Sequence, residues 1–291
     1  MIKDFFNGLA FGITQIVPGV SGGTIAILLG FYDKLIKAIN GLTTDFKKHF
    51  KFYIAFGLGI VIGFLTLSSL INYLLNEYSF PTMLFFVGLI TGIIPLVYFK
   101  VKTKKFFNIK EIAMVIIPII ILVVMAHISG ISVSNPTEAI SNINLPFMIF
   151  LLVVGFIAAS GLILPGVSGS FFLLLFGVYP LATYSIANIR LLLTDMTNTA
   201  LMLDLVKVLG PMLIGIILGV LLTARIVERL LEKHSRPTYL IILGLLIGST
   251  YVILRDPIVY QSGTSNIIFM IGAFTFLIGF VLSYLLGKKK V

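Results

Sequence analysis

The hexapeptide PGVSGG, at Pro18–Gly23, interrupts an apolar stretch near the start of the chain, and PGVSGS repeats it at Pro165–Ser170. The first five residues of the two copies are identical, and 147 positions separate them, about half of the 291-residue chain. Proline and glycine interrupt helices, because proline lacks an N–H donor and glycine leaves the backbone unrestrained. Two such interruptions at corresponding places predict a duplicated fold with a broken helix in each half.

The composition is that of an integral membrane protein. Hydrophobic residues make up 58% of the chain, charged residues 11%, and the mean hydropathy is +1.12, whereas soluble domains are about a quarter charged. We therefore expect an all-α, polytopic membrane protein. Seven apolar runs have about the length that a bilayer-spanning helix needs: Tyr53–Leu75, Thr82–Phe99, Ile112–His127, Phe147–Leu164, Leu205–Ala224, Tyr239–Leu254 and Ile267–Leu286.

Charge and residue usage argue against several classes of function. The net charge is +10, but the Lys and Arg residues lie in short loops between apolar runs, so membrane topology and anionic lipid explain them better than nucleic acid does. The chain has no Cys, and its three His residues are scattered, so we expect no metal and no cofactor. The apolar segments contain no His, Asp or Glu cluster suited to a nucleophile and base, which predicts a non-enzymatic protein.

The duplication extends beyond the hexapeptide. At the same offset of 147, Gly8, Gly30 and Tyr32 match Gly155, Gly177 and Tyr179. At an offset of 156, six further residues coincide: Gly59, Gly63, Pro81, Thr82, Gly88 and Gly92 fall on Gly215, Gly219, Pro237, Thr238, Gly244 and Gly248. We expect two homologous halves, residues 1–130 and 145–291, joined by a polar connector at 131–144. The Gly-x-x-x-Gly spacings at Gly59–Gly63 and Gly215–Gly219 predict close helix contacts.

Each half opens with a broken apolar segment. Its arms are Asp4–Val17 and Thr24–Asn40 in the first half, and Pro146–Leu164 and Phe171–Ala187 in the second. The arms of the first pair are short for a full crossing, so we expect in each half a re-entrant hairpin followed by three spans. Three crossings per half would invert the second half relative to the first.

Loop charges predict the orientation in the membrane. Three Lys-rich segments should be cytoplasmic: Asp33–Lys51, Lys100–Lys110 and Lys288–Lys290. The connector contains neither Lys nor Arg, so we expect it outside. Both chain termini are accordingly predicted on the cytoplasmic side of a multi-pass membrane protein.

Two oppositely oriented hairpins would bring their tips together near the midplane of the membrane. Irregular backbone survives there only when it is buried in protein or lines a wet cavity, and free N–H groups at the start of the next helix favour an anion. The predicted binding residues are those of the tips: Pro18, Gly19, Ser21, Gly22, Gly23, Thr24, Pro165, Gly166, Ser168, Gly169 and Ser170.

Four basic residues near the expected cavity mouths are further candidates for contact with an anion: Lys34, Lys37, Arg190 and Arg225. Lys34 and Lys37 also fit the ordinary role of lysines at a membrane interface. Arg225 lies at helical spacing from Glu228 and Arg229, which also fits an interface anchor with a local ion pair.

Three segments resemble the polyprenyl-phosphate transporter family, and the resemblance covers essentially the whole chain: IVPGVSGGT at Ile16–Thr24, FYDKLI at Phe31–Ile36, and LPGVSGS at Leu164–Ser170 with Gly177 and Tyr179 after it. The resemblance implies a flippase that recycles undecaprenyl phosphate across the bacterial cytoplasmic membrane. It further implies that the two tips are the functional loops. The second copy has Ser170 and Phe171 where the first has Gly23 and Thr24, so the tips need not contribute equally.

A membrane lipid with a phosphate head is thus the expected partner, and the oligomeric state stays open. The physical argument from the tips alone also fits an ion-coupled transporter or channel for a small soluble anion. A soluble anion requires a closed aqueous route, whereas a lipid carrier requires a side opening with apolar walls.

Overall fold

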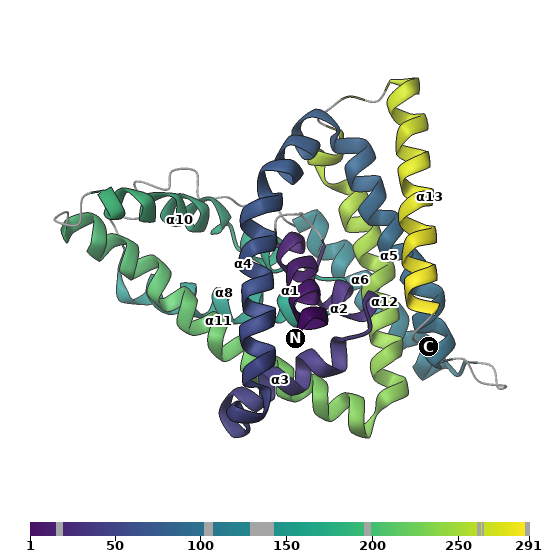
Figure 1. Cartoon of the computed structure of the whole chain (residues 1–291), viewed down its shortest axis with the longest axis horizontal. Helices are drawn as coiled ribbons and strands as arrows, with labels where there is room; N and C mark the ends of the chain where they lie inside the picture. Colours follow the sequence, from purple (N-terminus) through teal and green to yellow (C-terminus); the bar gives the residue numbers. More distant parts are fainter. Residues whose placement is uncertain are drawn as a thin grey trace.

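The computed structural model describes residues 1–15, 20–101, 107–128, 143–194, 199–260, 263 and 265–288. In these ranges the regular structure consists of helices (Figure 1). They are α1 (Ile2–Thr14), α2 (Gly22–Leu28), α3 (Tyr32–Thr44), α4 (Phe46–Glu77), α5 (Ser79–Val101), α6 (Ile109–Ile128), α8 (Leu145–Ile163), α9 (Gly169–Leu175), α10 (Tyr179–Thr194), α11 (Thr199–Lys233), α12 (Ser235–Arg255), the 3-10 helix η1 (Pro257–Tyr260) and α13 (Asn266–Lys288).

The helices confirm a polytopic membrane fold. Six helical segments of the described chain are long and apolar enough to cross a bilayer: Ser79–Val101, Ile109–His127, Leu145–Ile163, Leu201–Lys233, Ser235–Arg255 and Asn266–Gly287. Helix α4 additionally contains the predicted apolar run Tyr53–Leu75. The first arm of the second hairpin, α8, is therefore long enough to span the membrane by itself.

Glycine allows two helix pairs to pack with their backbones in contact. Helix α1 lies against α4, and α8 lies against α11. A Cβ atom added to Gly59 in α4 would collide with the carbonyl oxygen of Phe5 in α1, and one added to Gly215 in α11 would collide with that of Leu152 in α8. These contacts confirm the predicted role of the Gly-x-x-x-Gly spacings. Phe5 and Leu152 are themselves 147 positions apart, so the two pairs pack at corresponding positions.

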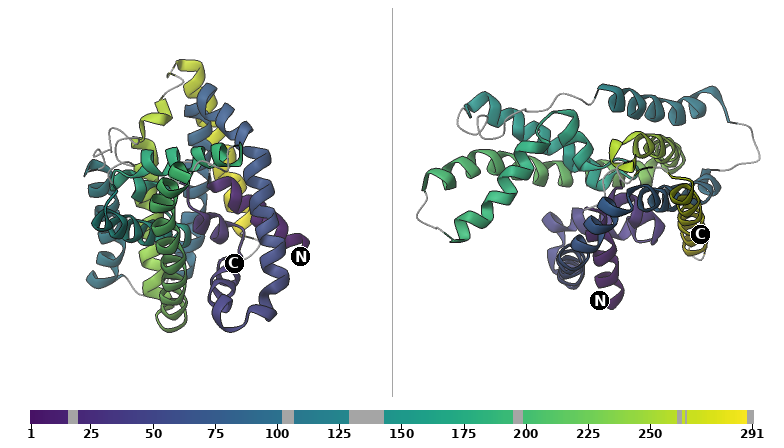
Figure 2. Two further views of the ribbon diagram at one scale, coloured as in Figure 1. Left: turned by 90° about the vertical axis from the view of Figure 1, so that its left-hand side faces the viewer. Right: turned by 90° about the horizontal axis from the view of Figure 1, so that it is seen from above.

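The later spans pack across the two halves. Helix α5 packs against α13, α12 packs against α6, and α5 also contacts α12. A Cβ atom on Gly88 in α5 would collide with the Phe276 carbonyl oxygen of α13, and one on the matching Gly244 in α12 would collide with that of Val115 in α6. The second span of each half thus lies against the third span of the other. Figures 1 and 2 show α5, α12 and α13 side by side, with α10 and part of α11 extending away from them. The inverted orientation of the halves stays a prediction.

The second arm of each hairpin is not one helix, so the predicted arms Thr24–Asn40 and Phe171–Ala187 are wrong in this respect. Gly30, with φ of 65°, separates α2 from α3, and Gly177, with φ of 72°, separates α9 from α10. In both turns the amide of the glycine and the amide after it bond back to carbonyls three and five residues earlier, the pattern of a glycine-terminated helix. Helices α9 and α10 meet at a bend of 118°.

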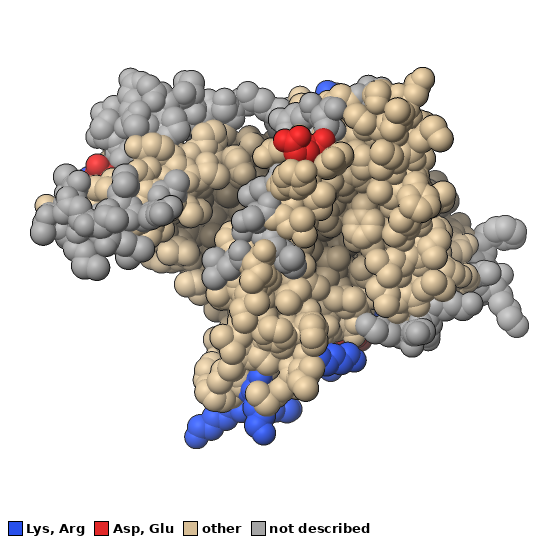
Figure 3. All heavy atoms as spheres, turned by 45° about the horizontal axis from the view of Figure 1, so that its top comes forward, with Lys and Arg blue, Asp and Glu red and all other residues tan. Residues whose placement is uncertain are grey.

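Charged side chains are unevenly distributed over the surface. On the face drawn in Figure 3, most visible Lys and Arg side chains gather at the end of the molecule where α3 meets α4, and acidic side chains appear toward the opposite end. The positive-inside rule places the cationic end of a membrane protein in the cytoplasm. Which end faces the cytoplasm in this protein stays a prediction.

Candidate functional site

Each hairpin tip is the start of a short helix with a serine at its N-cap. Ser21 precedes α2, and its hydroxyl oxygen accepts a hydrogen bond from the Thr24 amide at 3.1 Å, the usual way of capping a helix N-terminus. Ser168 precedes α9, but its hydroxyl oxygen lies 2.7 Å from that of Ser170, and within the described chain no amide donates to it. Helices α2 and α9 have seven residues each, so the dipole expected at each tip comes from only about two turns.

The structure brings the two tips into direct contact. The Ser21 hydroxyl donates to the Leu164 carbonyl oxygen at 3.1 Å. The Gly166 amide donates to the hydroxyl oxygen of Thr24 at 2.8 Å and to that of Ser21 at 3.2 Å. Ser21 is 2% exposed and Thr24 1%, so these polar bonds lie inside the protein. Segments more than 140 residues apart in the chain therefore share one buried hydrogen-bonded junction.

The tip junction, defined as Ser21, Thr24, Leu164 and Gly166, is closely packed. A Cβ atom on Gly23 would collide with the Ile163 carbonyl oxygen from the second tip. Gly166 has φ of +87°, a left-handed conformation that suits glycine, and a Cβ atom there would lie 2.6 Å from the Leu245 carbonyl oxygen in α12. In this arrangement the Ser21 and Thr24 hydroxyls bond to the opposite tip, while the Ser168–Ser170 pair does not take part in the junction.

The remaining predicted tip residues differ in exposure. Gly22 and Gly23 are buried in the first tip, Pro165 is buried in the second, and Gly169 and Ser170 of the second tip are partly exposed. Pro18 and Gly19 lie outside the described residues.

Lys34 is neutralised by a carboxylate. Its ammonium group bonds to the Asp4 carboxylate of α1 and lies 5.1 Å from the centre of the Phe52 ring. Burial raises the pKa of Asp4, but the hydrogen bond and positive charge of Lys34, together with the chain N-terminus, outweigh burial and hold this pKa below its usual value of 3.8. Lys34 therefore connects α3 to α1, and its positive charge is already neutralised by Asp4.

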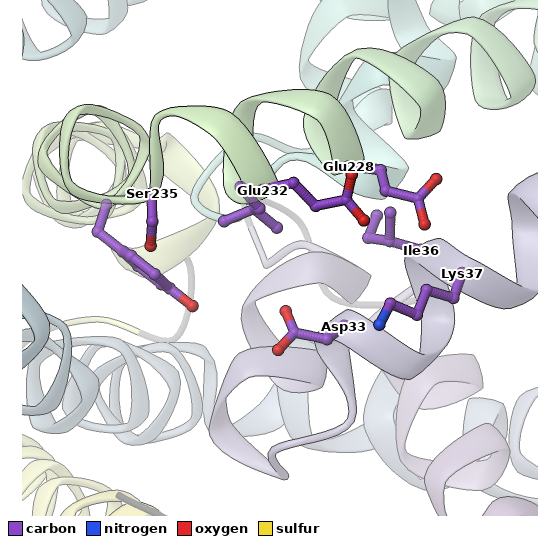
Figure 4. Close-up of a pocket in the computed structure, with 8 residues that line it drawn as sticks. Asp33, Ile36, Lys37, Glu228, Glu232 and Ser235 are labelled. Carbon is purple, nitrogen blue, oxygen red and sulfur yellow. The ribbon is translucent and has the colours of Figure 1, made fainter.

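Lys37 lies among carboxylates. It lines a cavity of about 210 Å³ between α3, α11 and α12, in which Figure 4 shows its side chain with those of Asp33, Glu228 and Glu232. The cavity is completed by Ile36, Leu231, Ser235 and Tyr239. Three carboxylates against one ammonium make this cavity, which we call the acidic cavity, unfavourable to a phosphate.

Arg225 links two helices. Its guanidinium donates to the Thr43 hydroxyl at 2.9 Å, and Asn40 donates to Glu228 at 2.5 Å one turn further along α11. Both bonds join α11 to α3, which favours the anchor interpretation of Arg225, although Glu228 pairs with Asn40 rather than with a neighbouring arginine. Arg190 belongs to α10, but its side chain lies outside the described residues.

Sequence reasoning missed a second polar group at the same end of the molecule. The Lys100 ammonium donates to the Tyr239 hydroxyl at 3.1 Å and lies 4.8 Å from the centre of its ring. Lys100 lies in the last turn of α5 and Tyr239 lies near the start of α12. The sequence shows Lys100 only as one charge in a basic loop, and no local pattern connects it with a tyrosine 139 positions later.

Comparisons with known proteins agree on one family. A family model described as VCA0040-like, undecaprenyl phosphate translocase-like, matches residues 11–267. A protein of Staphylococcus aureus (strain NCTC 8325 / PS 47) named polyprenyl-phosphate transporter is 33% identical over 98% of this chain and 95% of its own length. A protein of Vibrio cholerae with the same name is 29% identical over 85% of this chain and 76% of its own length. No solved structure matches the chain. The chain therefore belongs to the undecaprenyl phosphate translocase-like family.

Proposed function

We propose that this protein is a non-enzymatic carrier that moves undecaprenyl phosphate between the leaflets of the bacterial cytoplasmic membrane. Two relatives are named for the transport of polyprenyl phosphate, and the observation that supports the mechanism is the buried tip junction. Helix-breaking segments from both halves meet there, where backbone amides and hydroxyls can turn toward a phosphate once the tips part.

The energetic problem of such a carrier is the head group, because the isoprenoid tail can stay in lipid. Placing a charged group at the bilayer centre has a free-energy cost of at least about 2.5 kcal/mol. Preorganised donors offset this cost, since hydrogen bonds to a charged group are stronger than neutral ones. The amides and hydroxyls of Ser21, Thr24, Gly166, Ser168 and Ser170 are the donors that the two tips supply.

We propose that the structure corresponds to a closed state, in which the tips bond to each other instead of to substrate. Two donors make the hydrogen bonds between the tips: the Ser21 hydroxyl, and the Gly166 amide, which is shared between two acceptors. At about 1 kcal/mol net for each donor, these bonds contribute about 2 kcal/mol to the closed state, a difference small enough for an alternate state to be populated. Rocking of one half against the other would then expose the tips to each leaflet in turn.

An apolar groove supports a lipid over a soluble anion. A cavity of about 340 Å³ lies between α4, α5 and α13. Its walls are mainly aliphatic and aromatic: Ile71, Leu74, Tyr78, Pro81, Thr82, Phe85, Phe86, Ile271 and Thr275. A groove of this kind suits an isoprenoid chain, and it offers nothing to a small hydrated anion.

The test is transport in proteoliposomes with labelled undecaprenyl phosphate, followed by its accessibility from each side. The variant Ser21→Ala with Thr24→Val removes both junction hydroxyls. Thr66→Val is the matched control, because the Thr66 hydroxyl donates to the Ile62 carbonyl oxygen within α4 and makes no bond to either tip in the described part of the chain. We expect at least about a 10-fold loss of transport in the first variant, the equivalent of roughly 1.4 kcal/mol, and a change below about twofold in the control.

Two outcomes would contradict the proposal. If the double variant moved the lipid as fast as the parent, the tips would have no part in transport. If the parent instead carried inorganic phosphate and left the lipid in place, the soluble-anion alternative would be correct.

A further inference from the structure

A small cavity lies at the end of α2 that is remote from the tip junction. It occupies about 60 Å³ between the α2–α3 turn, the ends of α5 and α13 and the start of α12, and it is lined by Ile27, Gly30, Ile93, Leu96, Val97, Lys100, Tyr239 and Gly287. One water needs about 10–15 Å³ by the same measure, so the cavity has room for a group of several heavy atoms. Helix α2 runs from the junction to this cavity, a rise of about 10 Å.

The cavity is amphipathic. Ile27, Ile93, Leu96 and Val97 form an apolar wall, and the polar side chains of the lining are Lys100 and Tyr239. Lys100 bonds to Tyr239, and no carboxylate of the described chain pairs with it. By contrast Lys34 pairs with Asp4, and Arg236 pairs with Glu111. Lys100 thus presents an uncompensated positive charge beside an apolar surface.

The charges around Tyr239 differ on its two sides. Tyr239 also lines the acidic cavity, with Asp33, Glu228 and Glu232. A phosphate is repelled by that side and attracted by Lys100 on the other. The lysine of the acidic cavity, Lys37, is therefore the less suitable of the two ammonium groups for holding a phosphate.

We propose that the Lys100–Tyr239 cavity binds a phosphate monoester joined to an isoprenoid. It would be a second binding site for the head group, at the end of the protein that is predicted to face the cytoplasm. This inference rests on the proposed function. Lys100 and Tyr239 contact the phosphate, and the first isoprene unit lies on the wall formed by Ile27, Ile93, Leu96 and Val97. The apolar wall distinguishes a lipid phosphate from free phosphate, which would leave it unused.

The test is equilibrium binding of farnesyl phosphate, farnesol and inorganic phosphate to the purified full-length protein in nanodiscs. We expect farnesyl phosphate to bind more tightly than either of the others. Lys100→Ala should weaken its binding by about 10-fold or more, the loss typical of one hydrogen bond to a charged group, and leave farnesol binding unchanged. Lys100→Arg should retain most of the affinity. Lys51→Ala, at an exposed lysine of α4, is the matched control and should change binding by less than about twofold.

The outcomes separate this site from the transport proposal. Unchanged farnesyl phosphate binding in Lys100→Ala overturns the inference, even where the tip variant still stops transport. Equal affinities for inorganic and farnesyl phosphate overturn the lipid assignment of the cavity. Loss of binding in Lys100→Ala supports the inference, whether or not the parent passes the transport test.

Discussion

At the scale of single residues, the tip hydroxyls perform two tasks at once. Ser21 caps α2 and donates to the Leu164 carbonyl of the other tip, while Thr24 accepts from the Gly166 amide. The sequence indicates that these hydroxyls belong to a functional loop. It contains no information on whether they bond to a ligand or to the backbone of the opposite tip, because that partner lies more than 140 positions away in the chain.

Thr24→Val should destabilise the protein, because it leaves the buried Gly166 amide with only the longer bond to Ser21. An under-satisfied buried donor costs about 1–3 kcal/mol. We expect a lower midpoint of thermal unfolding in detergent for Thr24→Val and almost none of this loss for Thr66→Val, whose hydroxyl is exposed. Equal midpoints for the two variants would mean that the junction contributes nothing to stability.

The Asp4–Lys34 pair should make stability depend on pH in the acidic range. The pKa of Asp4 is lowered on folding, so the pair stabilises the protein above the usual pKa of 3.8 and loses this contribution as the pH falls through the lower value of the folded state. The stability difference between the parent and Asp4→Asn should therefore be present at neutral pH and shrink in this acidic range. A difference that stayed constant down to the lowest pH would contradict the ion pair.

At the scale of helices, the apolar runs predicted most of the spans, whereas the breaks were predicted in part. PGVSG marks the first break of each hairpin by its proline and glycines. Gly30 and Gly177 match across the two halves, but each lies in a continuous apolar stretch, so nothing in the composition shows that they end a helix. A single glycine ends a helix when it adopts a positive φ, as Gly30 and Gly177 do. Whether it does so depends on how the following segment packs.

The helix contacts can be tested with two glycines that lie two residues apart in α4. A Cβ atom on Gly59 would strike the α1 backbone, whereas one on Gly57 would meet nothing within 4 Å. We expect Gly59→Ala to destabilise the protein by about 1–3 kcal/mol through overpacking and Gly57→Ala to be neutral or mildly stabilising, since alanine favours a helix. The comparison uses thermal unfolding in detergent.

The duplication extends this prediction to the second half. Gly215→Ala should behave like Gly59→Ala, because Gly215 faces α8 as Gly59 faces α1. Gly210→Ala is the control in α11, where the nearest neighbour of an added Cβ is at 3.9 Å. If Gly215→Ala and Gly210→Ala were equally stable, α8 and α11 would not pack as described.

At the scale of the whole molecule, we propose that the two halves are inverted repeats whose third spans are exchanged. The contacts of α5 with α13 and of α12 with α6 support this arrangement. The coincidence of Gly88 with Gly244 at the offset of 156 helped to predict a duplicated chain. It could not predict the exchange, since the residues that face these glycines share no motif.

The predicted orientation can be tested by labelling, because the chain has no native Cys. Single variants Lys51→Cys and Lys233→Cys should react with a membrane-impermeant maleimide only from the cytoplasmic side, and Tyr78→Cys and Asn266→Cys only from outside. All four positions are exposed. Labelling of Tyr78→Cys and Lys51→Cys from the same side would contradict the topology and the inversion of the halves.

The central claim is that the two helix breaks meet inside the membrane and must part for the phosphate head to pass. Its most direct test is transport of undecaprenyl phosphate by the double variant Ser21→Cys with Leu164→Cys, measured oxidised and reduced, beside each single variant. In molecules whose two tips are joined by the disulfide, the account predicts that oxidation stops transport by the double variant alone and that reduction restores it. Equal transport in the cross-linked and reduced states would contradict it.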